Sequence, residues 1–107
     1  MPSAFAFEFD LSALPKLDAR GQNFHVWRSV WTLVLKSGDL FKHVSGESLK
    51  PPDPGESQDA WDLVDTEARL VLLTSVHSDH TLRITTCDTA AESWKRFANR
   101  YDRDTGT

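Results

Sequence analysis

The sequence predicts an all-α protein, a small bundle of about four to five helices with an extended N-terminal arm. Hydrophobic residues recur at helical spacing in three long segments, about residues 24–37, 57–77 and 90–102. Only a short N-terminal segment alternates with the period of two that is typical of a strand. A chain of 107 residues can bury one small core. We therefore expect an arm over residues 1–13, a helical domain over 14–102 and a polar tail over 103–107.

The composition excludes several classes of protein. A net charge of −4 argues against direct binding of nucleic acid, because phosphate contacts need clustered lysines and arginines. No apolar run reaches the roughly 18 to 20 residues that span a bilayer, and the first residues lack the features of a signal peptide. The single cysteine, Cys87, can form no internal disulfide. We expect a cytoplasmic protein with no membrane partner.

The N-terminal arm carries three phenylalanines on one face. In an extended chain Phe5, Phe7 and Phe9 lie on the same side, because successive side chains of a strand alternate. The rest of the sequence offers no partner strand. The arm therefore either packs against its own domain or pairs with another chain, and both alternatives stay open.

The first long helix is strongly amphipathic. Asn23 is a plausible N-cap, and Gly38 a plausible residue in the left-handed conformation after the last turn. The apolar stripe between them consists of Phe24, Trp27, Val30, Trp31, Val34 and Leu35. Three aromatic rings so close together would suit a stacking platform, but rings among aliphatic residues at helical spacing are typical of a core. We interpret them as core, joined by Trp61 and Trp94 from other helices.

Two apolar residues of this helix lie outside the stripe. Val26 and Leu33 are seven positions apart, which places them on one face. Either a second helix covers this face or it contacts another subunit.

The middle of the chain predicts a helical turn, a loop and a second long helix. Leu40, Phe41 and Val44 between two glycines suggest a single turn, and the proline-rich residues 47–57 an exposed loop. The second long helix should run from about Ser57 to His77. Its stripe consists of Trp61, Val64, Ala68, Val71 and Leu72. Leu63 and Leu70 lie nearly opposite, so we expect this helix to touch apolar surface on two sides.

The C-terminal third predicts a short element and a last helix. Residues 78–88 suggest a turn or short helix with Leu82 and Ile84 pointing inward. Thr89 and Glu92 match a capping box, with Thr89 as the N-cap and the Glu92 side chain reaching back to the backbone. The last helix, about 90–102, should bury Ala90, Trp94, Phe97, Ala98 and Tyr101.

No constellation of residues predicts catalysis or ligand binding. His77 and His80 with Cys87 nearby provide too few ligands for zinc, and we interpret them as ordinary polar residues at a helix end. The acids Asp59, Asp62, Asp65 and Glu67 fall on what we interpret as a solvated face near a helix start, where the macrodipole favours them. Phosphate-binding loops and nucleophile triads are absent from the sequence. We expect no enzyme, cofactor, metal or small-molecule substrate.

The order of several motifs resembles the Gag polyprotein of copia-type LTR retrotransposons. That family begins its first long helix with a Leu-x-Gly-x-Asn-Tyr/Phe-x-x-Trp segment and carries a Thr-Ala-x-x-x-Trp-x-x-Leu-x-x-x-Tyr segment further on. The resemblance covers about residues 14–102. The matching positions are Leu17, Gly21, Asn23, Phe24, Trp27, Leu40 to Val44, Trp61, Asp65, Ala68, Thr89, Ala90, Trp94, Phe97 and Tyr101. With Trp31, we expect most of them to form the core.

The resemblance implies a capsid-like N-terminal domain that performs no chemistry and assembles with copies of itself into virus-like particles. It implies that RNA is packaged by regions outside this chain. The candidate subunit contacts are Phe5, Phe7, Phe9, Val26 and Leu33. The loop before Asn23 is longer than usual in the family, and a Gag would continue beyond Thr107 into further helices and often a zinc knuckle. The alternative is a domesticated host protein that binds a peptide or protein partner.

Overall fold

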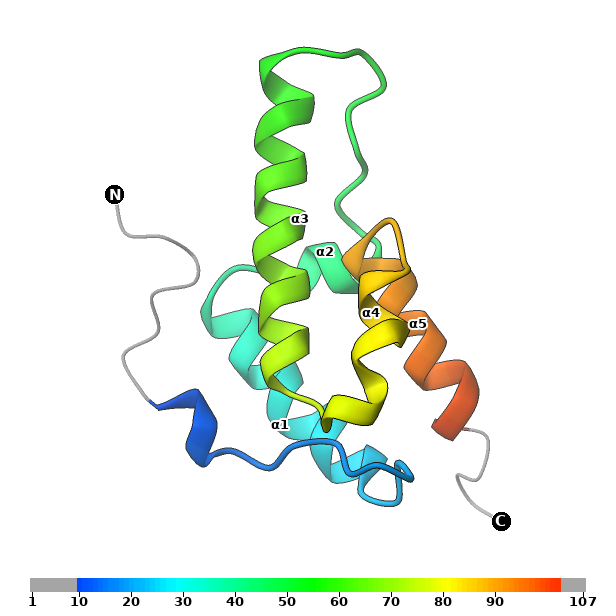
Figure 1. Ribbon diagram of the computed structural model, residues 1–107. Coiled ribbons are helices and arrows are strands. Elements are labelled where there is room, and N and C mark those ends of the chain that lie inside the picture. Colours follow the sequence, from blue (N-terminus) through cyan, green and yellow to red (C-terminus); the bar gives the residue numbers. More distant parts are fainter. Residues whose placement is uncertain (1–9, 103–107) are drawn as a thin grey trace.

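The computed structural model describes residues 10–102, and within them it is all-α, as predicted (Figure 1). The only strand-like pairing in this range is an isolated parallel bridge between Leu17 and Val76. The elements in chain order are the 3₁₀ turn η1 (Leu11–Ala13), α1 (Phe24–Ser37), α2 (Phe41–Ser45), α3 (Glu56–Thr74), the 3₁₀ turn η2 (Ser78–His80), α4 (Thr81–Thr85) and α5 (Ala90–Tyr101).

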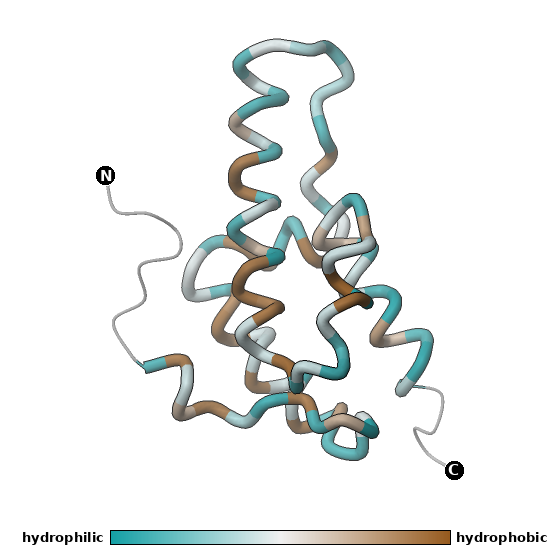
Figure 2. The backbone as a smooth tube through the Cα atoms, viewed as in Figure 1, coloured by the Kyte–Doolittle hydropathy of each residue, from teal (hydrophilic) through white to brown (hydrophobic). Residues whose placement is uncertain are grey.

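The hydrophobic core lies in the lower half of the molecule, where the helices converge. Figure 2 shows the tip, formed by the loop and the first turn of α3, as mostly hydrophilic. The buried apolar residues of the core include most of the predicted stripes: Leu17, Phe24, Trp27, Trp31, Val34, Leu35, Leu40, Val44, Ala68, Val71, Leu72, Val76, Ile84, Ala90 and Phe97. The periodicity of α1, the later turns of α3 and α5 therefore identified the buried faces correctly.

The end of α1 differs from the prediction by one residue. Gly38 has a φ of −98°, whereas Asp39 has a φ of +59° and is the left-handed residue. The backbone N–H of Leu40 donates to the carbonyl of Leu35 at 2.8 Å, and that of Asp39 to Lys36 at 3.2 Å. This is the pair of hydrogen bonds of a Schellman ending, which places the reversal after Gly38. Aspartate tolerates this conformation better than most side chains.

The second long helix ends three residues earlier than predicted, at Thr74. The cause is tertiary, because the backbone of the next residues pairs with the N-terminal segment instead of continuing the helix. The N–H of Leu17 donates to Ser75 and the N–H of His77 donates to Leu17, both at 2.9 Å. Figure 1 shows this N-terminal segment crossing beneath α3 and α4.

Three leucines that were expected to meet apolar surface lie on the outside. Leu63 is 63% exposed, Leu70 43% and Leu82 71%, while Ile84 is fully buried as predicted. No element of the described chain covers Leu63 and Leu70, so α3 is buried on one face. On the five-residue helix α4, the turn geometry leaves room for only one of its two apolar residues in the core.

The start of α5 shows one half of the predicted capping box, the cap by Thr89. The hydroxyl of Thr89 accepts a hydrogen bond from the backbone N–H of Glu92 at 3.1 Å. The carboxylate of Glu92 was predicted to reach back to the backbone but instead lies 3.7 Å from the guanidinium of Arg96, one turn further along. The helix then buries Ala90 and Phe97, with Trp94, Ala98 and Tyr101 packed at the edge of the core.

Candidate functional site

We call the residues that match the Gag motifs the signature residues. Several of them meet at the lower end of the bundle, around an extended stretch that we call the crossing segment (residues 15–18). Asn23, predicted to cap α1, forms no side-chain capping bond. Its carboxamide oxygen instead accepts from the N–H of Asp18 at 3.0 Å, and its amide nitrogen donates to the carbonyl of Lys16 at 2.8 Å. An amide can form this pair because it both donates and accepts. Asn23 therefore holds the crossing segment against the start of α1.

Both indoles of α1 also hold this end of the molecule. Trp27 donates its ring N–H to the carbonyl of Ser75, and Trp31 donates to that of Pro15, each at 2.7 Å. Phe24, Trp27 and Trp31 are at most 2% exposed. The interpretation of these rings as core, rather than as a stacking platform, is confirmed. A buried indole satisfies its single donor in this way.

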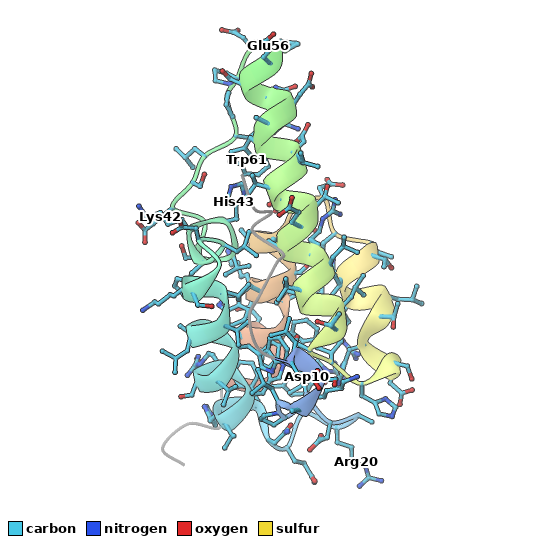
Figure 3. All side chains as sticks on the ribbon, turned by 90° about the vertical axis from the view of Figure 1, so that its left-hand side faces the viewer. Asp10, Arg20, Lys42, His43, Glu56 and Trp61 are labelled. Atoms are coloured by element: carbon cyan, nitrogen blue, oxygen red, sulfur yellow. The ribbon has the colours of Figure 1, made fainter. Side chains whose placement is uncertain are left out.

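The aromatic cluster joins α1 to α5 but excludes one predicted member. Trp94 lies 5.3 Å and Phe97 5.5 Å from Trp27, measured between ring centroids. Trp61 lies elsewhere, with its ring 4.7 Å from that of His43 and its N–H donating to the hydroxyl of Ser48. Figure 3 shows Trp61 and His43 together above the main core. Trp61 therefore fixes the loop after α2 rather than the cluster on α1.

Asp65 was predicted on a solvated face and is instead 2% exposed. Both of its oxygens accept from the backbone N–H of Ala90, at 3.1 and 3.2 Å, so it caps the start of α5 from a different helix. The ring of His43 lies 3.4 Å and the guanidinium of Arg69 3.6 Å from it. A carboxylate at a helix N-terminus is favoured by the macrodipole, and the guanidinium of Arg69 is a cationic partner for it. Asp65 thereby connects α2, α3 and α5.

The sequence contained a signal for the burial of Asp65. It lies four residues after Trp61 and three before Ala68, on the same face as the stripe of α3. An acid at a stripe position is rare unless it has buried partners. His43 carries a similar signal, because it lies between Leu40 and Val44 on the short helix α2 and is 8% exposed.

The histidines that suggested a metal serve the fold in different ways. His80 is fully buried: its Nε2 lies 2.6 Å from the carbonyl of Asp18, and its Nδ1 accepts from Arg83 at 3.1 Å. Because a guanidinium can only donate, Nε2 must carry the proton and donate to Asp18. His77 is exposed, and the thiol of Cys87 donates to the carbonyl of Arg83. Among residues 10–102, no three of the His, Cys, Asp and Glu side chains are arranged to hold a metal ion.

The face of α1 outside the stripe is open to solvent. Val26 is 59% and Leu33 69% exposed, so no second helix of the described chain covers them. Leu33 borders a hollow of about 320 Å³, which we call the α1 groove. It is lined by Leu14, Val30, Leu33, Val34 and Ser37. The candidate contacts Phe5, Phe7 and Phe9 lie outside the described residues. No helix within residues 10–102 has the length and hydrophobicity to cross a membrane.

The fold and these contacts define a small helical domain whose signature residues are used for packing. Residues 31–107 match the family model described as gag-polypeptide of LTR copia-type, which covers more than half of the chain. The chain therefore belongs to the copia-type Gag family, as the order of its motifs indicated. The matched range begins at Trp31, after the Leu17-to-Trp27 motif. No curated protein and no solved structure matches the chain.

Proposed function

We propose that this domain is a structural self-assembly module, the capsid-like N-terminal domain of a copia-type Gag that builds virus-like particles through contacts between copies. The main support for this proposal is that the apolar residues fall into a buried set and an exposed set. The signature residues are nearly all used inside the fold, whereas Val26 and Leu33 lie 59% and 69% exposed on the outward face of α1. Large exposed aliphatic residues beside an apolar hollow are typical of interaction surfaces.

The acidic charge fits a division of roles within a longer Gag. With a net charge of −4, the domain lacks the electrostatic attraction that RNA packaging needs. Element RNA would be bound by regions outside this chain, and the domain itself would act in the cytoplasm by contact alone, without catalysis.

The test is self-association of the purified protein, by sedimentation velocity and electron microscopy across concentration and salt. The wild-type chain should form rings, lattices or shells that a Val26→Ser/Leu33→Ser variant fails to form. Leu82→Ser is the matched control, because Leu82 is 71% exposed but lies on α4. A wild-type chain that stays monomeric under all conditions, or equal assembly by all three proteins, contradicts the proposal.

A second candidate is an adaptor, a domesticated Gag domain that binds a peptide of a host partner. The observation in its favour is a hollow of about 550 Å³ beside α2. Its lining combines apolar, polar and charged side chains of both signs: Phe41, Val64, His43, Ser48, Lys36, Lys42, Asp39 and Glu47. A hollow that combines apolar side chains with charged groups of both signs suits a short peptide. The gene downstream of Thr107 separates the two functions: protease, integrase and reverse transcriptase favour assembly, whereas a stop codon or an unrelated domain favours the adaptor.

A further inference from the structure

The α1 groove is apolar along almost its whole lining. Four of its five lining residues are aliphatic, and the hydroxyl of Ser37 already donates to the carbonyl of Val34 at 2.7 Å. Water in such a groove finds few partners, so apolar side chains that displace it gain free energy. The groove therefore suits an apolar or aromatic occupant and offers little to a charged one.

One wall of the groove belongs to the N-terminal part of the chain. Leu14 is positioned beside α1 because the next residue, Pro15, accepts the indole N–H of Trp31. The turn η1 precedes Leu14, and the carboxylate of Asp10 caps it by accepting from the backbone N–H of Ser12 at 3.0 Å. At the rise of a 3₁₀ turn, Asp10 lies within about 10 Å of Leu14. Figure 3 shows Asp10 and η1 on the face of the molecule turned toward the viewer.

The segment that ends at Asp10 carries the three phenylalanines of the arm. In an extended chain, Phe5, Phe7 and Phe9 repeat on one face about every 6.8 Å. On α1 the exposed Val26, the half-buried Val30 and the exposed Leu33 follow one another at steps of about 6 and about 4.5 Å along the helix axis. The two series match closely enough for rings on the arm to lie between and over the aliphatic residues of the helix.

We propose that residues 1–9 bind in the α1 groove of their own chain and cover Val26 and Leu33 in the free subunit. The length and the attachment point support this occupant. Nine residues reach roughly 30 Å when extended, and the 14 residues of α1 span about 21 Å. A short tether also gives the arm an effective concentration on the order of millimolar, well above that of a second copy in dilute solution.

The consequence for assembly rests on the proposed function. If Val26 and Leu33 form the contact between copies, the bound arm competes with that contact, and assembly requires the arm to leave the groove. The arm then sets the concentration at which copies associate, because its own binding free energy must be overcome first.

Cysteine cross-linking tests the position of the arm in the full chain. In a Cys87→Ala background, Phe7→Cys is combined with Leu33→Cys in one protein and with Leu82→Cys in a matched control. A disulfide requires the two α-carbons to approach within about 7 Å. At low protein concentration, the first pair should form an intrachain disulfide roughly tenfold faster or more than the control pair. Far-UV circular dichroism and urea unfolding check that each variant is folded.

Each other outcome overturns the proposal. A disulfide of the first pair that forms only between chains places the arm on a second copy. Equal rates for the two pairs show an arm with no preferred position, and absence of a disulfide in a folded protein shows that the groove does not hold the arm. None of these results depends on whether particles form. The position of the arm can therefore be determined even if the proposed assembly function is wrong.

Self-association of a Phe5→Ser/Phe7→Ser/Phe9→Ser variant gives an independent measurement. Removing the rings should strengthen association, because Val26 and Leu33 are then uncovered. Weaker or unchanged association in a folded variant contradicts a covering role. If neither this variant nor the wild-type chain associates at all, the proposed function is wrong, and so is the proposal that the arm covers a contact between subunits. The cross-linking result still shows where the arm lies.

Discussion

Gly21 lies directly against the aromatic ring of Tyr101, so closely that a Cβ on Gly21 would be 2.3 Å from Cε1 of that ring. Gly21 also has a φ of +70°, a conformation that favours glycine. Two signature positions 80 residues apart in the sequence are thus explained by one contact, in which the loop before α1 packs on the last turn of α5.

Gly21→Ala should destabilise the domain more than the backbone conformation alone would predict. Gly46→Ala is the matched control, because Gly46 has a φ of +85° but its Cβ would meet only Ala91, at 3.9 Å. We expect a loss of about 1 kcal/mol for Gly46→Ala and about 2 kcal/mol more for Gly21→Ala. Urea unfolding measures both. Equal losses would show that the loop moves away from Tyr101 at little cost.

Two substitutions of Asn23 can show whether its side chain stabilises the fold by holding the crossing segment or by capping α1. Serine is as good an N-cap as asparagine, but it cannot reach both Lys16 and Asp18. We therefore expect Asn23→Ser and Asn23→Ala to lose stability alike, by about 1 to 2 kcal/mol. A stability of Asn23→Ser close to the wild type would restore the capping interpretation.

Among the acidic residues of α3, Asp65 should be the one whose substitution destabilises the domain most. Asp65→Ala removes both acceptors of the Ala90 N–H and leaves His43 and Arg69 without their carboxylate, so we expect a loss of about 3 kcal/mol or more. Asp62→Ala is the control, because the carboxylate of Asp62 forms an exposed ion pair with Lys50 and its removal should cost about 0 to 1 kcal/mol. Equal losses in thermal unfolding would contradict the connecting role of Asp65.

Asp18 should contribute to the loss of folding stability at acidic pH. Its carboxylate accepts a backbone hydrogen bond from Gln22 and another from Arg20, and these lower the pKa of Asp18 below its ordinary value although desolvation acts in the opposite direction. A group whose pKa is lower in the folded state stabilises the fold above its unfolded pKa, and this stabilisation is lost as the pH falls through the folded pKa.

The urea midpoint of the wild-type chain should therefore decrease below about pH 5, and Asp18→Asn should decrease less over the same range. The amide of asparagine keeps an acceptor for the two N–H groups without titrating. Parallel pH profiles of the two proteins would show that Asp18 does not contribute.

The sequence by itself determined the helical class, the positions of the helices and most of the core. These follow from local periodicity, and the Thr89 cap was readable because its two partners lie three residues apart. Most of the motifs that identify the family are core positions of the same kind, which is why their order indicated copia-type Gag.

The tertiary structure alone decided what the polar signature residues do and which apolar residues stay outside. Asp65 finds its main partner 25 residues away and His80 bonds a carbonyl 62 residues away, so no local pattern specifies either pairing. Leu63, Leu70 and Leu82 have the hydrophobicity of core residues, but their burial depends on whether a neighbouring element covers them. Periodicity identifies the faces of a helix, and only the packing of the whole chain determines which of those faces meets a partner.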